Sequence, residues 1–349
     1  MVRIAINGYG RIGRLAHRVL LDTYGEYAQV VAINAGSSTD IEGWMYLLKY
    51  DSVYGTFNKS INYHLSSTNN ELGMIGSLII DNKTIPVFSE KDPSLLPWKE
   101  LKVDVVIEST GHLLTKEQLQ THLKAGAKKV VLSAPGKDGV PTYVISVNED
   151  TYAQEDIISN ASCTTNCIAP VAKIIQENFG IEKAMMTTIH GYTSDQRLQD
   201  GGHKDYRRAR AAGENIIPTS TGATKAVAQA LPSLANKFEG LAIRVPVATG
   251  SLSDCTFLLE KDVTKEEVNA VFEKAAETKN YQGILSITND PIVSSDIIGN
   301  PLSALVDLSL TQVVGGNLLK VVAWYDNEYG YANRLVEQAI MVGNTAKSS

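Results

Sequence analysis

Residues 2–21 (VRIAINGYGRIGRLAHRVLL) decide the expected fold of the first half of the chain. The apolar run at 2–7 predicts a buried strand, and three glycines follow at once in residues 8–13. Residues 14–21 have helical character, and the apolar run at 29–34 (QVVAIN) predicts the next strand. Because this order makes a β–α–β unit, the sequence predicts two parallel strands joined by a crossover helix.

The rest of the first half continues the alternation of strands and helices. A helix is expected at 115–125, ended by Gly126, and further strands are expected at 77–80, 84–87, 104–108 and 130–133. Pro86 has no backbone N–H to donate, which favours an edge position for the strand that contains it. The pattern indicates an α/β fold with a Rossmann-type, doubly wound and mostly parallel sheet.

The second half has a different pattern. Runs typical of strands occur without regular helices between them, at 184–188, 241–245, 252–259 and 317–324. This arrangement indicates an α+β catalytic domain with a large mixed or antiparallel sheet. The expected domains are a dinucleotide-binding domain at 1–162, completed by a C-terminal helix within 327–349, and a catalytic domain at 163–326.

Two helices of the second half have clear sequence signals. Thr264 with Glu267 forms a capping box that opens an expected helix at 263–278. A last helix is expected at 333–341, and we expect the polar tail at 343–349 to be frayed.

The bulk composition limits the kind of protein. A length of 349 residues, at about 100–200 residues per domain, favours two domains. The formal net charge of −6 disfavours non-specific nucleic-acid binding. Three cysteines argue against a disulfide framework and fit a reducing compartment. No apolar run approaches the ~20 residues of a membrane span, so we expect a cytoplasmic protein without a membrane partner.

Gly8, Gly10 and Gly13 form the pattern G-x-G-x-x-G between the first predicted strand and helix. The first glycine permits a tight turn, the second lets the backbone approach a pyrophosphate, and the third lets helix and strand pack closely. The helix N-terminus adds partial positive charge. This context favours nucleotide binding over a purely structural turn.

The dinucleotide pattern also requires an acidic residue at the end of the second strand, to bind the ribose hydroxyls of NAD. Ala35 stands there, after Asn34, and the nearest acid is Asp40, well past the tip. The absence of an acid removes the repulsion of the extra phosphate of NADP, while Ser37 and Ser38 offer small hydroxyl donors. The sequence therefore predicts acceptance of NADP; the alternative is a variable turn without consequence.

Cys163 is expected at the N-terminus of a helix that runs to about residue 178. The helix dipole favours an anion there, which lowers the pKa of a thiol. A cysteine alone is more often structural, but His190 at the end of a predicted strand supplies the base that a nucleophilic cysteine needs. Cys167 lies one helical turn on, unlike a C-x-x-C metal site, so we expect a core role for Cys167 and no metal.

Basic side chains are concentrated in residues 203–210 (HKDYRRAR). A solvated loop and a nucleic-acid patch are alternatives, but a phosphate site is favoured because guanidinium groups bind phosphate with two hydrogen bonds. Residues 218–222 (PTSTG) lead into a helix at Ala223, again a geometry suited to anions. Arg244 lies near the end of the predicted strand at 241–245.

At these residues the sequence resembles the phosphorylating glyceraldehyde-3-phosphate dehydrogenase family, and the resemblance extends over essentially the whole chain. The matching stretches include INGYGRIGR at 6–14, LKYDSVY at 48–54, ESTG at 108–111, SNASCTTN at 159–166, NIIPTSTG at 215–222 and WYDNEYGY at 324–331. The resemblance implies oxidation of glyceraldehyde 3-phosphate to 1,3-bisphosphoglycerate, with NAD or NADP, in glycolysis or gluconeogenesis.

The resemblance also implies roles for individual residues. Cys163 would attack the aldehyde carbon, His190 would take up protons, and inorganic phosphate would cleave the resulting thioester. The residues that resemble the family's two phosphate sites are Ser162, Thr164, Thr221 and Gly222 for the attacking phosphate, and Thr193 and Arg244 for the substrate's own phosphate, with Arg208 contributing to phosphate binding.

The resemblance places the cofactor mainly on residues of the first half. Arg11 and Ile12 would contact the pyrophosphate, Ser133 and Asn327 would fix the nicotinamide, and Tyr331 would pack behind its ring. The other expected cofactor residues are Gly8, Gly10, Gly13, Asn34, Ala35, Ser37, Ser38, Lys91, Ser109 and Thr110.

Two departures from the family's pattern lie near the expected ribose site. Ala35 replaces the acid of NAD-specific members, and Gly202 replaces a common proline in a loop that borders the adenosine of a neighbouring subunit. Both changes open space near the ribose 2′ position and strengthen the prediction that NADP is accepted. The resemblance also implies a homotetramer.

Three alternatives stay open at this point. An erythrose-4-phosphate dehydrogenase would let water cleave the acyl enzyme, but the retained Thr164, Thr221 and Arg208 favour a phosphate acceptor. A semialdehyde or acyl-phosphate reductase fits the SNASCTTN stretch less well. A non-catalytic nucleotide-binding protein would require a damaged site, whereas Cys163 and His190 are both present.

Overall fold

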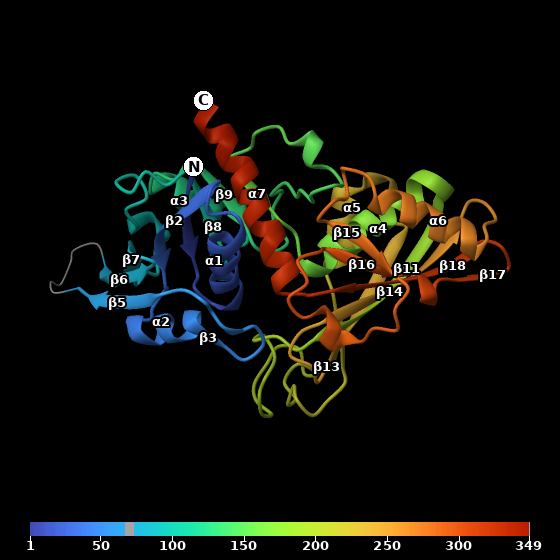
Figure 1. The fold of residues 1–349 in the computed structure, drawn as a ribbon, viewed down its shortest axis with the longest axis horizontal. Coiled ribbons are helices and arrows are strands. Elements are labelled where there is room, and N and C mark those ends of the chain that lie inside the picture. Colours follow the sequence, from blue (N-terminus) through green and yellow to red (C-terminus); the bar gives the residue numbers. More distant parts are fainter. Residues whose placement is uncertain (67–72, 349) are drawn as a thin grey trace. The chain divides into compact units, whose positions relative to one another are not determined.

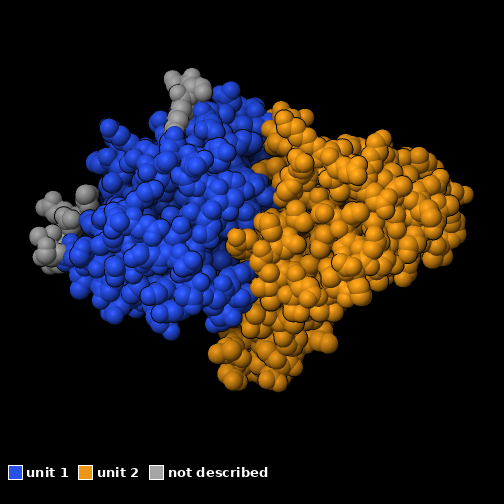
Figure 2. All heavy atoms as spheres, viewed as in Figure 1, with its two compact units in different colours: residues 1–143, 152–161, 332–349 blue, residues 144–151, 162–331 orange. Residues whose placement is uncertain are grey.

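The computed structural model of the protein describes residues 1–66 and 73–348, which divide into two compact units (Figure 2). The first unit comprises Met1–Tyr143, Tyr152–Ala161 and the chain from Ala332 onward, and the second comprises Val144–Thr151 and Ser162–Tyr331. The predicted pairing of a Rossmann-type domain with an α+β domain is confirmed by their sheets.

The sheet of the first unit has the strand order β10–β9–β8–β1–β2–β7–β6–β5. Pairs from β10 to β7 are parallel, and β6 pairs antiparallel with both β7 and β5. The strands are β1 (Val2–Asn7), β2 (Ala28–Asn34), β5 (Ile61–Leu65), β6 (Met74–Ile80), β7 (Lys83–Phe88), β8 (Val105–Glu108), β9 (Lys129–Leu132) and β10 (Ile157–Ser159). The mostly parallel sheet is the one predicted.

Helices connect several of these strands along the chain. Helix α1 (Arg11–Thr23) begins directly after the glycine turn that ends β1, and it buries Leu15 and Leu20 in the core. The other elements of this unit are α2 (Ile41–Lys49), the hairpin of β3 (Tyr50–Asp51) and β4 (Gly55–Thr56), the 3-10 turn Pro93–Leu95, α3 (Lys116–Lys124) and most of α7 (Tyr329–Ser348). A capping box of Thr115 and Gln118 opens α3.

The expected edge position of the strand that contains Pro86 is wrong, because β7 lies between β2 and β6. Its pairing with β2 involves only Val87 and Phe88, so the ladder on that side begins after the proline. An interior strand tolerates the missing donor because no partner faces Pro86 on the β2 side.

The second unit is built on a mixed sheet with the order β12–β13–β11–β14–β18–β16–β15, and β17 pairs with β18. Pairs β11–β13 and β15–β16 are parallel, and the others are antiparallel. The strands are β11 (Ile181–Gly191), β12 (Ile217–Ser220), β13 (Phe238–Val245), β14 (Ser251–Leu259), β15 (Leu285–Thr288), β16 (Ala304–Asp307), β17 (Gln312–Val314) and β18 (Leu318–Tyr325).

Three helices gather on one side of this sheet (Figure 1): α4 (Cys163–Phe179), α5 (Ala223–Ala230) and α6 (Lys265–Ala276). The predicted capping box of α6 is confirmed, since the Thr264 hydroxyl accepts from Glu267 N and the Glu267 side chain accepts from Thr264 N. Short 3-10 turns at Glu149–Thr151, Pro232–Leu234, Ser294–Ile297 and Leu308–Leu310 complete the unit.

The last helix is longer than predicted, and the expected fraying of the tail is wrong for residues 343–348. Helix α7 continues to Ser348, while residue 349 lies outside the described residues. A Cβ built on Gly343 would lie 2.3 Å from Val2 Cγ1, so this glycine lets the helix pack directly on β1. Tertiary packing therefore outweighs the polar composition of the tail.

Residues 144–151 belong to the second unit, although the expected domain range placed them in the first. Lys173 of α4 donates from Nζ to the carbonyl of Val147 at 2.8 Å, and Asn280 donates to the carbonyl of Ser146 at 3.2 Å. These side chains attach the segment to the second unit.

Candidate active site

A cavity of about 490 Å³ lies in the first unit. It is lined by residues at the ends of β1 and β2 and by residues that follow β8. Eight predicted cofactor residues line it, namely Gly8, Gly10, Asn34, Ala35, Ser37, Lys91, Ser109 and Thr110. Sequence reasoning missed eight others: Asn7, Tyr9, Gly36, Trp44, Glu90, Pro93, His112 and Leu113. The carboxyl ends of parallel strands are where open α/β sheets bind ligands.

The three glycines of the turn have the geometry that the dinucleotide pattern requires. A Cβ on Gly8 would lie 2.6 Å from Thr110 N, and Gly8 has a positive φ of 94°. A Cβ on Gly13 would lie 2.2 Å from the Gly8 carbonyl oxygen, so the helix can approach only without a side chain there. At Gly10 no atom lies within 4 Å of a built Cβ, which leaves room for a pyrophosphate above the helix N-terminus.

The Arg11 side chain turns toward Asp51, with Nη1 and Nη2 lying 3.1 and 3.3 Å from its two carboxylate oxygens. Its predicted contact with the pyrophosphate would therefore come from the backbone N–H groups of Arg11 and Ile12 rather than from the guanidinium. Ser38 and Ser133 are likewise absent from the described lining of the cavity.

The end of β2 is fixed by the Asn34 amide. Asn34 Nδ2 donates to Asn7 Oδ1 at 2.7 Å and to the Glu90 carbonyl at 2.8 Å, and Asn34 Oδ1 accepts from Glu90 N at 3.0 Å. The next residue, Ala35, donates from its backbone to the Phe88 carbonyl at 2.8 Å. The wall formed by Ala35 is thus held to the segment after β7.

Nearby acids are engaged in local turns. Asp40 caps α2 by accepting from Gly43 N at 2.8 Å, and Glu90 Oε1 accepts from Asp92 N at 2.9 Å. Asp40, the nearest acid in sequence, is therefore used as a helix cap rather than as the missing ribose ligand.

The predicted cysteine and histidine of the second unit lie in contact. Cys163 is the first residue of α4, which Ser162 caps through a hydrogen bond from Thr165 N to its hydroxyl at 3.1 Å. His190 is the penultimate residue of β11, and its Nε2 lies 3.4 Å from Cys163 Sγ. The geometry suits proton transfer between thiol and imidazole.

Burial dominates the protonation of both groups. It raises the pKa of the Cys163 thiol, while Arg244 and hydrogen bonds from Thr164 act in the opposite direction. Backbone N–H groups of Cys163 and Thr164 at the helix start also lower the pKa, as expected, but burial outweighs them. Burial, together with the positive charge of Arg244, lowers the pKa of His190 to about 3. The resting pair is a neutral thiol beside a neutral imidazole.

His190 Nδ1 has two incompatible neighbours. The Gly191 carbonyl oxygen, which only accepts, lies 2.6 Å away, and Arg244 Nη1, which only donates, lies 2.7 Å away. A protonated Nδ1 donates to the carbonyl and leaves Nε2 free to accept the thiol proton. The other tautomer accepts from Arg244 and directs an N–H at the sulfur.

Sequence reasoning missed Tyr325, the last residue of β18. Its hydroxyl lies 2.9 Å from Thr164 Oγ1 and 2.8 Å from Thr188 Oγ1, and its ring meets the His190 ring edge-on. Tyr325 belongs to the stretch 324–331 that resembles the family, but strand alternation alone gave it no role. It fixes Thr164 behind Cys163.

Arg208 lies with Thr219 and Ser220 of β12, the strand that leads to Thr221 and Gly222. Its Nε donates to Thr219 Oγ1 at 2.9 Å, its Nη2 donates to the Ser220 carbonyl at 3.1 Å, and its Nη1 pairs with Asp195 at 2.5 Å. Any anion at Arg208 would compete with this ion pair.

Thr193 and the Thr221–Gly222 turn occupy defined positions in the same unit. Thr193 begins a turn closed by Gln196 N donating to its carbonyl at 3.0 Å. Gly222 is the N-cap residue of α5, and the Thr221 hydroxyl accepts from Ala223 N at 3.2 Å. The predicted helix start at Ala223 is therefore confirmed.

Asn327 is buried, and its amide oxygen accepts from Ser251 Oγ at 2.7 Å and from Thr249 Oγ1 at 3.1 Å. With the oxygen held in this way, the amide nitrogen remains the group that can donate to a nicotinamide carboxamide. Tyr331 is buried in the same unit.

Neither a metal cluster nor a membrane span was found in the part of the chain that the structure describes. No group of three His, Cys, Asp or Glu side chains could hold a metal ion there. Within the same residues, no helix is both long and apolar enough to cross a bilayer.

Comparisons with known proteins match both halves of the chain. The model of the glyceraldehyde 3-phosphate dehydrogenase NAD binding domain matches residues 2–116, and the model of the C-terminal domain of the same enzymes matches residues 162–327. The chain is 51% identical over 345 residues to glyceraldehyde-3-phosphate dehydrogenase 2 of Streptomyces avermitilis, covering 98% of this chain and 99% of the relative.

Two further relatives extend the comparison. The glyceraldehyde-3-phosphate dehydrogenase of Thermotoga maritima is 53% identical over 338 residues, which cover 97% of this chain and 98% of the relative. Glyceraldehyde-3-phosphate dehydrogenase 2 of Bacillus subtilis is 48% identical over 339 residues, which cover 96% and 95%.

The fold and these matches define a two-domain oxidoreductase whose first unit binds a nicotinamide dinucleotide. The chain belongs to the glyceraldehyde-3-phosphate dehydrogenase family.

Proposed function

We propose that this chain oxidises glyceraldehyde 3-phosphate with inorganic phosphate to 1,3-bisphosphoglycerate. The observation that carries the proposal is the 3.4 Å contact between Cys163 Sγ and His190 Nε2 at the N-terminus of α4, in a chain of this family. Nicotinamide, when bound, supplies the hydride acceptor.

The residues of the second unit perform the remaining steps. Cys163 Sγ attacks the aldehyde carbon, and its proton passes through His190 Nε2 to the aldehyde oxygen, which gives a thiohemiacetal. His190 then takes the hydroxyl proton as hydride leaves, so a thioester remains on Cys163. A phosphate oxygen attacks the thioester carbonyl, and the thiolate of Cys163 leaves as the acyl phosphate forms.

Two sites for anions support the phosphate chemistry. Arg244 is mostly buried beside the Cys163–His190 pair, and among the described residues its Nε has no hydrogen-bond partner. A buried, unsatisfied guanidinium N–H is suited to a phosphate of the substrate, with Thr193 as a second ligand. We assign the attacking phosphate to Ser162, Thr164, Thr221 and Gly222, at the starts of α4 and α5, with Arg208 at their side.

An assay of cofactor reduction tests the proposal. Purified protein with glyceraldehyde 3-phosphate should reduce the cofactor rapidly only when inorganic phosphate is present. Phosphate-independent turnover would show that water cleaves the thioester, and no turnover with any phosphorylated aldehyde would contradict the proposal.

We also propose that the enzyme accepts NADP at least as readily as NAD. Ala35 lines the cavity where NAD-specific members carry an acid, and Lys91 and Ser37 line the same cavity. Asp40 is used as a helix cap, so no carboxylate is assigned to the ribose hydroxyls. Gly202, which replaces a common proline, belongs to the same proposal.

Substitution of Ala35 tests this specificity. Ala35→Asp should lower kcat/KM for NADP by about 10- to 100-fold relative to NAD, because it places a carboxylate against the extra phosphate. Ala35→Ser is the matched control, since it adds a polar group without charge. A wild-type enzyme with a strong preference for NAD would contradict the proposal.

A homotetramer is part of the proposed function. Met185, Leu241 and Leu318 are exposed apolar residues on β11, β13 and β18, three strands of the mixed sheet in which β14 lies between β11 and β18, as expected of a face that meets another copy. The molar mass from light scattering during size-exclusion chromatography should equal four chains, and a stable monomer would contradict this part.

We propose a cytoplasmic location because Cys163, Cys167 and Cys255 are all free thiols, as in a reducing compartment. Cell fractionation with activity measurement checks this assignment.

A further inference from the structure

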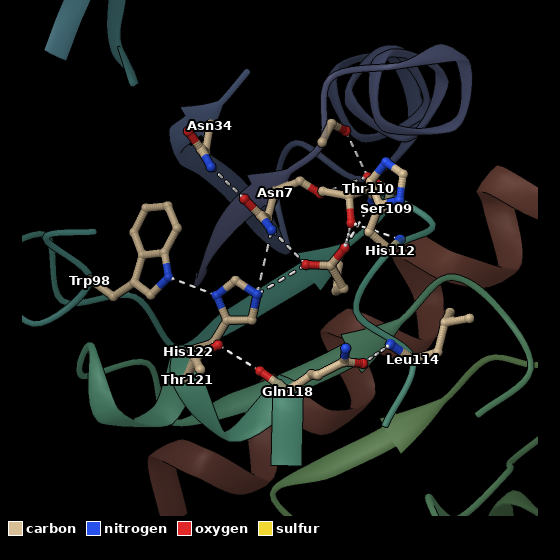
Figure 3. Close-up of polar contacts among 12 residues, drawn as sticks. Asn7, Asn34, Trp98, Ser109, Thr110, His112, Leu114, Gln118, Thr121 and His122 are labelled. Carbon is tan, nitrogen blue, oxygen red and sulfur yellow. Dashed lines mark hydrogen bonds and ion pairs between the residues drawn. The ribbon is translucent and has the colours of Figure 1, made fainter. Parts of the chain in front are cut away.

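A buried polar cluster of the first unit is built around Glu108 and His122. Figure 3 shows His122 between Trp98 and Asn7 in this cluster. Both side chains are fully buried, with no exposed surface. Glu108 is the last residue of β8, and His122 lies on the buried face of α3. Neither residue lines the cavity, and neither takes part in the chemistry at Cys163.

The hydrogen bonds fix the tautomer of His122. The indole Nε1–H of Trp98 can only donate, and it lies 3.1 Å from His122 Nδ1. His122 Nδ1 is therefore the acceptor, and the ring hydrogen sits on Nε2. His122 Nε2 lies 3.0 Å from Glu108 Oε2, so the histidine donates to the carboxylate, and the Asn7 amide nitrogen lies 3.5 Å from the same ring nitrogen.

Glu108 receives donors on both oxygens. Oε2 accepts from His122 Nε2 and from Asn7 Nδ2, the latter at 2.5 Å. Oε1 accepts from Thr110 N at 2.8 Å and from the Thr110 hydroxyl. The Thr110 hydroxyl oxygen accepts in turn from His112 N at 3.2 Å. The carboxylate thus shapes the loop after β8, of which Thr110 and His112 line the cavity.

The same carboxylate reaches the opposite wall of the cavity through two amides. Asn7 donates to Glu108 and accepts from Asn34, and Asn34 is bonded on both sides of its amide to the backbone of Glu90. Asn7, Asn34 and Glu90 all line the cavity. The chain from Glu90 then leads to Trp98, which closes the ring of contacts at His122.

We propose that Glu108 and His122 are positioning residues of the dinucleotide site, which hold the ends of β1 and β2 and the loop after β8 in the geometry that binds the cofactor. The proposal rests on the dinucleotide site of the proposed function, and not on its aldehyde chemistry. The Glu108 carboxylate can hold three walls of the cavity because each wall is hydrogen-bonded to its oxygens, either directly or through a side-chain amide.

Direct binding of NAD and of NADP, measured by calorimetry, tests the proposal apart from catalysis. Glu108→Gln keeps the shape of the side chain. Its amide NH₂ would face one of the two pairs of donors that now bond to the carboxylate oxygens. It should raise the dissociation constant by about 10- to 100-fold, the loss expected when charge-assisted hydrogen bonds fail. In steady state the KM for the cofactor should rise by a similar factor, while kcat at saturating cofactor stays within about threefold.

The matched control is Asp104→Asn, just before the other end of the same strand. Asp104 is also a buried acid, which accepts from Arg3 N at 3.0 Å and pairs with Lys128 at 3.0 Å, but it does not line the cavity. Its substitution should lower the melting temperature while leaving the dissociation constant within about threefold. If both variants weaken cofactor binding equally, Glu108 serves only stability and the proposal is wrong.

Two substitutions of His122 keep the test decisive if the Glu108 variant does not fold. In His122→Gln an amide N–H replaces Nε2–H and should restore near-normal cofactor affinity. His122→Leu removes the donor and should raise the dissociation constant by about tenfold. Equal affinities in these two variants would overturn the proposal. Unchanged cofactor affinity in Glu108→Gln would overturn it as well, whereas a wild-type enzyme that binds the cofactor but does not oxidise the aldehyde would count against the proposed function instead.

Discussion

Two buried histidines show how differently the two units use polar groups. In the first unit, His122 Nδ1 accepts from Trp98 at 3.1 Å and Nε2 donates to Glu108 at 3.0 Å, while the amide nitrogen of Asn7 lies farther from Nε2, at 3.5 Å. In the second unit, His190 Nδ1 lies between a pure donor and a pure acceptor, which it cannot satisfy together. The first histidine has one stable tautomer, and the second has two competing ones.

This difference matches what each site must do. A binding pocket gains affinity when its walls are fixed before the ligand arrives, and a fully satisfied network provides that. A general base must gain and lose a proton in each turnover, and at position 190 the tautomer that donates from Nδ1 to the Gly191 carbonyl leaves Nε2 free to do so. Arg244 provides the competition, since it opposes the bond from Nδ1 to the Gly191 carbonyl.

The largest expected effect is a loss of catalysis in the second unit without a change of cofactor binding in the first. Cys163→Ser keeps the size of the side chain but removes the nucleophile, so kcat/KM should fall by about 10⁴-fold or more. Cofactor affinity should not change beyond about threefold, because the network of the first unit does not include Cys163. Steady-state kinetics and calorimetry on the same preparation check both statements. Retained turnover would mean that Cys163 is not the nucleophile.

Substitution of the histidine should give the next largest effect. His190→Asn keeps an N–H for the Gly191 carbonyl but removes the nitrogen that faces Cys163 Sγ, so kcat should fall by about 10²- to 10⁴-fold. The rate of alkylation of Cys163 by iodoacetamide should fall with it near neutral pH. A variant that keeps the wild-type alkylation rate would show that His190 does not take the thiol proton.

Substitution of Arg244 should have a smaller effect, and its effect on the pKa values of Cys163 and His190 should depend on the charge of the new side chain. Its cation lowers the pKa of both Cys163 and His190, so Arg244→Gln should shift the Cys163 alkylation profile to higher pH and move the pKa of His190 up toward its ordinary value. The KM for the aldehyde should rise by about 10- to 100-fold.

Arg244→Lys is the matched control for charge. It should keep most of the alkylation profile but not the KM, since an ammonium cannot replace the two-pronged guanidinium. Equal alkylation profiles in the glutamine and lysine variants would show that the charge of Arg244 does not act on the pair.

The sequence predicted the elements with strong local signals and missed those set by packing. The glycine turn, the helix that begins at Cys163 and the capping box of α6 are local patterns, and the structure contains all three. The interior position of β7 was not predictable, because it depends on where β2 begins to pair rather than on Pro86 itself.

The same distinction applies to the candidate site. The contact of Cys163 with His190 followed from residue types and the family resemblance. The contacts of Tyr325 with Thr164 and of Glu108 with His122 arise only when separate elements pack together, and no residue pattern links them. The raised pKa of Cys163 was also missed, since burial is a property of the packed unit and the helix dipole is a local one.

The smallest expected effect is a loss of stability in acid. Each unit has a buried histidine with a lowered pKa, His17 in the first unit and His190 in the second. Burial lowers the pKa of His17 to about 3, and that of His190 is lowered to the same value. Both values lie below the ordinary value near 6.5, so the unfolded chain binds more protons between these limits. Stability that is present above pH 6.5 is therefore lost as the pH falls toward 3.

Each histidine should contribute a loss of about 2 kcal/mol in the free energy of unfolding between pH 7 and pH 5. His17→Asn should reduce the measured loss by that amount, and the exposed His64→Asn should leave it unchanged. Urea unfolding at the two pH values, followed through Trp44 and Trp98 of the first unit, provides the measurement. His17 does not contact Cys163 or His190, so its substitution should leave kcat at saturating cofactor unchanged; its Nδ1 lies 2.7 Å from the hydroxyl of Tyr9, which lines the cofactor cavity. An equal loss in the His17 and His64 variants would show that burial of His17 does not govern the acid stability of its unit.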